Sequence, residues 1–242
     1  MREWRALGAA IAANFSDGLV ADSPSAMIRS LLRPSSSMMD KHDDFNMLAL
    51  GSLNLAHIGW WCGALGSPTT LAFLFYADAL YLIADSCWLL FAPSCVPQQS
   101  RSTLLAHHLL VCGCLPIAAG RPVLMRHLLR TWIVEVHSWN HIAIRRLVPA
   151  KLISWLSWLN KPLFTALRLI AFPLTYFQYA KERAALTEAI RLAHSPLGLH
   201  VGLSGAHLMM YGLMVKWGYQ LIWRPWRQEL QASSKEEVKP SA

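Results

Sequence analysis

Residues 69–92, TTLAFLFYADALYLIADSCWLLFA, decide the fold class of this chain. A helix that crosses a bilayer needs about 20 consecutive, mostly apolar residues. This stretch meets that length, and its charged side chains are Asp78 and Asp85. It therefore predicts a membrane-spanning helix that carries carboxylates where carboxylates are costly.

Five further stretches have the same apolar character, and each is read as a span: residues 46–66, 103–119, 122–144, 162–180 and 197–223. The stretch at 122–144 is the most polar of them. Prolines stand at or beside the ends of the spans, where they disturb a helix least: Pro68, Pro93, Pro97, Pro122, Pro162 and Pro196. The sequence predicts an all-α, polytopic membrane protein with about six transmembrane helices in a bundle.

The overall composition agrees with a membrane protein and excludes an ordinary soluble domain. Of the 242 residues, 54% are hydrophobic and 15% are charged, against about 25% charged in an average globular protein. Mean hydropathy is +0.31. Lysine and arginine number 22 against 14 acidic residues, a net charge of +8. In an apolar chain this surplus predicts basic cytosolic loops, and nucleic acid is not expected as a partner.

The distribution of lysine and arginine over the loops predicts the orientation. With six spans both termini share one side, and that side holds Arg2, Arg5, Arg29, Arg33, Lys41, Arg101, Arg145, Arg146, Lys151, Lys161, Arg224, Arg227, Lys235 and Lys239. The opposite side holds Arg121, Lys181, Arg183 and Arg191. By the positive-inside rule both termini are expected in the cytosol.

The chain divides into an N-terminal cytosolic or interfacial segment (1–45), the membrane domain (46–224) and a polar tail expected to be disordered (225–242). Ala6–Phe15 is too short to cross a membrane. It is read either as a surface-lying amphipathic segment or as the core of a targeting signal, and whether residues 1–22 form such a signal stays open. Residues 148–161 are expected to form a short interfacial helix.

Polar side chains inside the predicted spans are the candidate functional residues. Asp78 and Asp85, seven residues apart, project from one helical face with Tyr81 between them. They either line an inner cavity, or Asp78 hydrogen-bonds a neighbouring helix while Asp85 lies near a membrane interface. The adjacent His107 and His108 suit proton transfer. Because neighbours on a helix differ by about 100°, at most one of the two is expected to point squarely at a given target.

The fourth and fifth spans contribute two opposite charges. Helical spacing places Glu135 on nearly the opposite face from His137 and His141, so a metal centre is not expected there. Glu135 is predicted to be the buried partner of an arginine. Arg168 is expected either to extend toward the cytosolic end or to pair with Glu135 or Asp78.

The remaining polar and sulfur-containing residues of the spans are read as packing residues. His57 and His207 are expected to be satisfied within the bundle. The five cysteines are odd in number, and Cys112 and Cys114 point about 200° apart on a helix. The sequence therefore predicts no disulfide framework, no metal site and no bound cofactor.

The order of these residues resembles the TLC-domain family, which includes the ceramide synthases. The similarity lies in YADALYLIADSCWLL (76–90), in the His107–His108 pair 29 residues after Asp78, and in Glu135 27 residues past His108, which opens EVHSWNHIAIRRL. It continues in LNKPLFTALRLIAFP, where Asn160, Phe164 and Arg168 stand. It covers about residues 45–224.

The resemblance implies a helical bundle around a lipid-accessible cavity, in the endoplasmic reticulum, with membrane lipids as partners. The polar residues of that cavity would be Asp78, Tyr81, Asp85, His107, His108, Glu135 and Arg168. The fourth span has Glu135 and no aspartate, which is closer to the members that are not synthases. The chain is therefore expected to bind, sense or transport lipids or to control membrane lipid composition.

The alternative that the resemblance offers is an N-acyltransferase of the ceramide-synthase type. His107 and His108, with Asp78, would then be the catalytic residues. Acyl-CoA would be the co-substrate of a sphingoid base, and ceramide the product.

Overall fold

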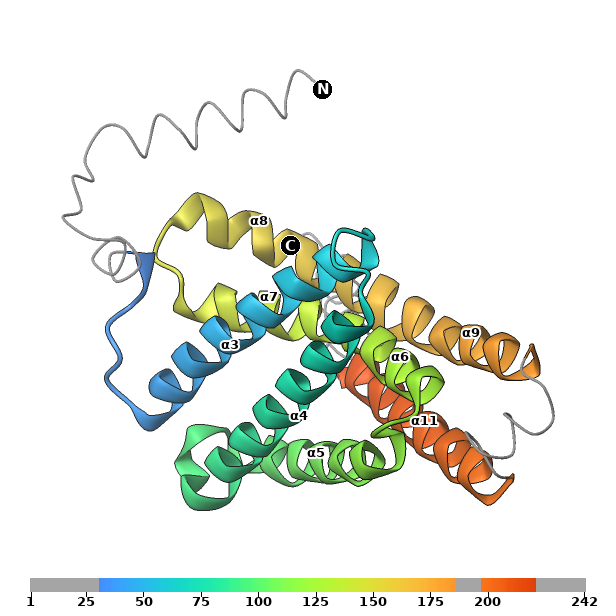
Figure 1. Ribbon diagram of the computed structural model, residues 1–242. Coiled ribbons are helices and arrows are strands. Elements are labelled where there is room, and N and C mark those ends of the chain that lie inside the picture. Colours follow the sequence, from blue (N-terminus) through green and yellow to red (C-terminus); the bar gives the residue numbers. More distant parts are fainter. Residues whose placement is uncertain (1–30, 186–196, 221–242) are drawn as a thin grey trace, which may run out of the picture.

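The chain is an assembly of helices in the computed structural model, which describes residues 31–185 and 197–220 (Figure 1). Its α-helices are α3 (Met38–Trp61), α4 (Pro68–Phe91), α5 (Gln98–Ala118), α6 (Pro122–Thr131), α7 (Glu135–Arg146), α8 (Ala150–Leu163), α9 (Phe172–Ala184) and α11 (Leu197–Gly218). Two 3₁₀ segments, η1 (Pro93–Cys95) and η2 (Trp132–Val134), and one π-helix, η3 (Phe164–Ala171), lie among them. These ranges hold no strand, only one isolated bridge between Leu32 and Leu147, so the all-α prediction is confirmed.

Some predictions fall outside the described residues. They are the segment Ala6–Phe15, the tail at 225–242, Pro196, and the last residues of the span predicted at 197–223.

Capping residues and prolines set the helix starts. Ser37 forms a capping box with Asp40, which explains why α3 begins at Met38, well before the predicted span at 46–66. Pro68 and Pro122 occupy the first positions of α4 and α6, where a missing N–H costs nothing. After α3 the chain turns at Gly63, whose φ of 78° is a left-handed conformation that favours glycine.

The fourth and fifth predicted spans are helices with local changes of pitch. The fourth is α6 and α7 joined by the 3₁₀ turn η2. The helix predicted at 148–161 is α8, and its interfacial position stays a prediction. Helix α8 packs along α7 and continues directly into η3 and α9. Pro162 therefore lies inside a helix and not at its start. Since proline lacks an N–H and crowds the preceding turn, the wider π-helical turns that follow it accommodate the break.

The helices pack in neighbouring pairs (Figure 1). Helix α3 lies along α7 and also contacts α4, α4 packs on α5, and α6 packs on α9. Helix α11 contacts η3, α9 and α5. The largest apolar cluster includes Leu74, Phe75, Leu124, Leu129 and Tyr179, and it holds α4, α6 and α9 together.

Large apolar side chains cover much of the outside of this assembly. Leu55, Phe73, Leu80, Phe91 and Leu208 are between 66% and 84% exposed. By length and composition, two helical stretches among the described residues are long and apolar enough to cross a membrane, Pro68–Phe91 and Ser100–Ala118. They coincide with the spans predicted at 69–92 and 103–119, while the six-span topology stays a prediction.

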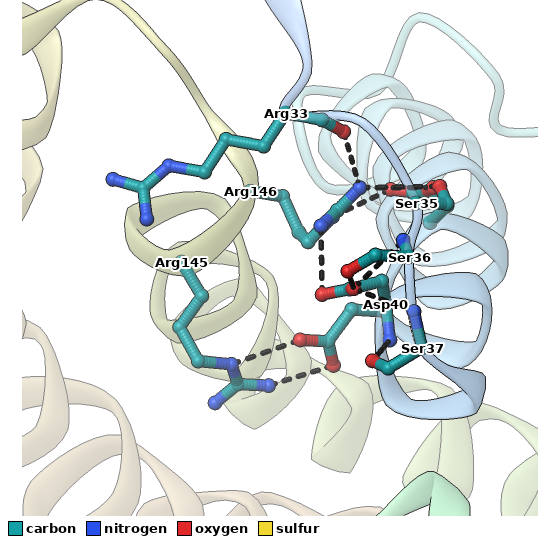
Figure 2. A network of polar contacts seen from close by, with 9 residues as sticks. Arg33, Ser35, Ser36, Ser37, Asp40, Arg145 and Arg146 are labelled. Atoms are coloured by element: carbon teal, nitrogen blue, oxygen red, sulfur yellow. Dashed lines mark hydrogen bonds and ion pairs between the residues drawn. The ribbon is translucent and has the colours of Figure 1, made fainter.

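An arginine clamp, formed by Arg145 and Arg146 at the end of α7, holds the start of α3 (Figure 2). Arg146 is buried and binds Asp40 at 2.9 Å and Asp44 at 2.7 Å. Arg145 binds Asp43 through two nitrogens, at 2.7 and 2.9 Å. Hydrogen bonds from the Ser37 hydroxyl and backbone, and then from Ser36, hold the pKa of Asp40 well below its usual range.

We expect Arg146→Ala to lower the free energy of unfolding by about 2–4 kcal/mol, because it leaves Asp40 and Asp44 without their buried counter-charge. Arg145→Ala is the matched control. Its own side chain is 41% exposed, so its removal costs little packing, but it leaves one buried carboxylate, Asp43, without a counter-charge. A smaller loss of about 1–2 kcal/mol is therefore expected. Denaturant unfolding of the protein in detergent micelles measures both values, and equal losses would contradict the asymmetry.

Candidate functional site

A cavity of about 420 Å³ lies between α3, α4, α5, α7, η3 and α11. This volume falls within the range of about 300–1,000 Å³ that is typical of small-molecule sites. Six of the predicted site residues line it: Tyr81, Asp85, His107, His108, Glu135 and Arg168. Four predicted spans thus contribute to one site, as expected of a shared cavity.

Asp85 is the centre of a group of polar contacts in this cavity, with a hydrogen bond to His42 and a charge contact with His108. One carboxylate oxygen lies 2.6 Å from Nε2 of His42, and the other lies 3.4 Å from Nδ1 of His108. Asn46 contacts His42 at 3.0 Å and accepts a hydrogen bond from the Tyr81 hydroxyl at 3.0 Å. A carboxylate between two histidines can orient their rings and stabilise a proton on either of them.

His42 and Asn46 are site residues that sequence reasoning missed. They lie at or before the start of the span predicted at 46–66, where a polar stretch was assigned to the N-terminal segment. The signal that could have found them is the spacing of His42 and Asn46, four residues apart, which places both on one face of a helix.

Asp78 does not line the cavity, which is a correction to its prediction as a candidate catalytic residue. Its carboxylate is hydrogen-bonded to Nε2 of His57 at 3.0 Å, and both side chains are buried. The His57 ring stacks on Trp132, with centroids 5.4 Å apart, and Trp132 donates to Asn54 at 3.2 Å. Asp78 therefore joins α4 to α3. His57 was expected to be satisfied within the bundle, and this holds for its Nε2, whereas its buried Nδ1 has no hydrogen bond in the described residues.

His107 and His108 both line the cavity but differ in their contacts. His108 faces Asp85, while Nδ1 of His107 lies 3.2 Å from the sulfur of Met210. The two rings are tilted by 55°, with centroids 5.3 Å apart. As the helical spacing predicted, only one of the pair contacts the carboxylate.

Glu135 was expected to lie opposite His137 and His141, but all three line the same cavity. The 3₁₀ turn η2 directly precedes Glu135, and the cavity extends around more than one side of α7. Glu135 is also not the buried ion-pair partner of an arginine. Among the described residues its carboxylate has no ion pair and no hydrogen bond, and the residue is half-buried.

Arg168 fits neither predicted alternative. It is buried, with 6% of its surface exposed, so it does not extend to the solvent. No carboxylate in the described part of the chain lies within ion-pair distance of it. Its NH2 group donates to the Ser138 hydroxyl and to the Val134 carbonyl, and its guanidinium lies 6.0 Å from the Phe164 ring and 5.5 Å from the Trp217 ring.

A smaller space of about 70 Å³ adjoins the cavity. Leu82, His107 and Glu135 line both. The rest of its lining is mostly apolar and includes Val134, Phe172, Leu203, Met210 and Met214. A polar chamber and an apolar one therefore share a wall.

Within the described ranges, no three His, Cys, Asp or Glu side chains are grouped so that they could hold a metal ion. All five cysteines are free, and burial raises the pKa of the Cys95 thiol. In comparisons with known proteins, no family model, no curated protein and no solved structure matches this chain.

We expect double-mutant cycles to show that Asp78 and Asp85 belong to two energetically independent groups of side chains. Thermal unfolding in detergent of His57→Ala, Asp78→Asn and the double variant should give a coupling free energy of about 1–3 kcal/mol, because the two side chains are in direct contact. The same coupling is expected between Asp85 and His108. Asp78 and His108 have no hydrogen bond or ion pair, so their effects should add within about 0.5 kcal/mol, and strong coupling there would place Asp78 in the cavity network.

Proposed function

We propose that the chain is a multi-pass membrane protein of the TLC-domain type that holds an amphiphilic lipid in its central cavity, and so binds, senses or moves lipids. The observation that carries this proposal is the cavity itself, where a polar chamber adjoins an apolar one inside a bundle with an apolar outer surface.

The distribution of side chains supports a membrane environment. Polar side chains such as Asp78, Asp85, Asn140 and Arg168 are buried, whereas many large apolar ones face outward. A soluble protein would have to solvate that outer surface with charge, and this chain has little charge to do so. In the proposal, the six spans are α3, α4, α5, the α6–α7 rod, the α8–α9 rod and α11.

The predicted orientation of the chain indicates the side of the membrane toward which the cavity lies. Arg145, Lys216 and Pro97 line it and lie at helix ends that lead into the loops predicted to be cytosolic. In the proposal the cavity therefore faces the cytosol, both termini are cytosolic, and the membrane is that of the endoplasmic reticulum.

We expect Leu104→Trp to reduce the lipid that copurifies with the protein several-fold, because Leu104 lines the cavity and the larger ring fills it. Leu109→Trp is the matched control on the same helix, since Leu109 is 59% exposed on the outside. Lipid mass spectrometry of the purified variants, normalised to protein, measures the difference. Equal lipid content in both variants and the unaltered protein would remove the cavity as the binding site.

A second candidate is N-acyl transfer from acyl-CoA to a sphingoid base. One observation favours it: His108 lies against Asp85, and His42 against the same carboxylate, which is an arrangement suited to general acid–base chemistry. His107 or His108 would take the proton of the amine as its nitrogen attacks the thioester carbonyl. The C–S bond then breaks, and CoA leaves and takes up a proton to become the free thiol. The position of Asp78 outside the cavity removes one of the three residues on which this candidate was first based.

For this second candidate we expect a negative result. Purified protein or microsomes given labelled acyl-CoA and sphinganine should form no ceramide above the level of the His107→Ala/His108→Ala double variant. Microsomes with known sphinganine acylation serve as the positive control. Robust product that disappears in the double variant would reverse the ranking of the two candidates.

A further inference from the structure

We propose that the Arg168 end of the cavity binds the anionic headgroup of a single-chain amphiphile, either a carboxylate or a phosphate monoester. This inference rests on the proposed lipid-binding function and specifies the ligand of that site.

Arg168 is held in place but incompletely hydrogen-bonded. A guanidinium has five N–H donors in a rigid fork. In the described structure its acceptors, the Ser138 hydroxyl and the Val134 carbonyl, both bind its NH2 group, while its buried Nε has no hydrogen-bond partner. The rings of Phe164 and Trp217 stabilise the positive charge, but they do not replace hydrogen-bond acceptors.

The arginines of α6 and α7 show what Arg168 lacks. Arg145 and Arg146 bind aspartates of α3, and Arg126 and Arg130 bind Glu182. A buried cation without a carboxylate is costly. Because Arg168 lines the cavity, an anion that enters the cavity can supply the missing acceptors in the bidentate manner that guanidinium favours.

His137 adds a second unsatisfied group on the same wall. It is 4% exposed and lines the cavity, and apart from a poorly aligned contact with the Asn160 side chain its ring nitrogens have no hydrogen bond in the described residues. Its ring lies one helical turn from His141 and packs against the edge of Phe164, with centroids 5.1 Å apart. A headgroup at Arg168 would therefore also meet an N–H donor of His137.

The acidic residues of the cavity differ in how strongly they would oppose the binding of an anion to Arg168. Asp43 is neutralised by Arg145, and Asp85 lies between two histidines. Glu135 remains, without an ion pair, and exerts an electrostatic attraction on Arg168. Removal of the Glu135 charge should therefore strengthen the binding of an anion, which is the opposite of the effect of removing Arg168.

The test measures equilibrium binding of labelled palmitate, hexadecyl phosphate and hexadecanol to the full chain purified in detergent. We expect the two acids to bind about 10-fold or more tighter than the alcohol, because a hydrogen bond to a charged group contributes a factor of this size. Arg168→Gln should abolish that preference and leave hexadecanol binding unchanged. Glu135→Gln should raise the affinity for palmitate several-fold.

Arg126→Gln is the charge-matched control, because Arg126 pairs with Glu182 and does not line the cavity. This variant should leave the affinities for palmitate, hexadecyl phosphate and hexadecanol unchanged. If Arg168→Gln does not fold, Ser138→Ala carries the test, since it removes the acceptor that orients the guanidinium and should weaken palmitate binding, while Glu135→Gln strengthens it.

Three results would overturn the proposal. Equal binding of acid and alcohol, insensitive to Arg168, would remove the anion site but leave lipid binding in place. Inorganic phosphate that binds as tightly as hexadecyl phosphate would show a site for a free anion and not for an amphiphile. Binding of no amphiphile at all would remove the proposed function together with this inference.

Discussion

The contact of Asp85 with His42 and His108 is the interaction on which the site depends. Each of the three side chains comes from a different helix, α4, α3 and α5, and all three are buried. A carboxylate in an apolar interior costs several kcal/mol unless hydrogen bonds or charges compensate it. This requirement holds the three helices at fixed positions around the cavity, and it places Tyr81 and His107 on the same wall. The His57–Asp78 pair makes a second contact between α3 and α4 and so fixes their crossing.

Most helices could be predicted from the sequence, because long apolar runs indicate where they lie and prolines indicate where they begin or end. The start of α3 could not, since His42, Asp43 and Asn46 are polar by any hydropathy scale and yet are buried against α4 and α7. The sequence also did not show which of the two aspartates, Asp78 or Asp85, lines the cavity. Helical spacing shows that the two carboxylates share a face, but the position of α3 and its histidines decides which of them reaches the cavity.

The surroundings of Glu135 and Arg168 could not be predicted for a different reason. Glu135, His137 and His141 all belong to α7, and the cavity reaches more than one side of that helix. Arg168 lies inside the π-helix η3, and its neighbours depend on how η3 packs against the 3₁₀ turn η2 and against α11, which spacing along one helix does not reveal. Such irregular turns often mark functional sites, and here the two lie beside each other and supply Glu135, Phe164 and Arg168 to the cavity wall.

The buried polar residues of this bundle are of two kinds, and the difference bears on function. His57 and Asp78 bind each other, as do Arg146 and its aspartates, and such mutual pairing is what structural contacts between helices require. Arg168 and His137 have buried nitrogens without a well-aligned hydrogen bond among the described residues, and both line the cavity together with the unpaired Glu135. Buried polar atoms without a partner are costly, and they also occur elsewhere in the described bundle, as at Arg130 and His207. What distinguishes the cavity is that a buried guanidinium without a carboxylate and a buried imidazole border a volume of about 420 Å³. This combination favours a bound headgroup that completes their hydrogen bonds while its chain lies among apolar side chains.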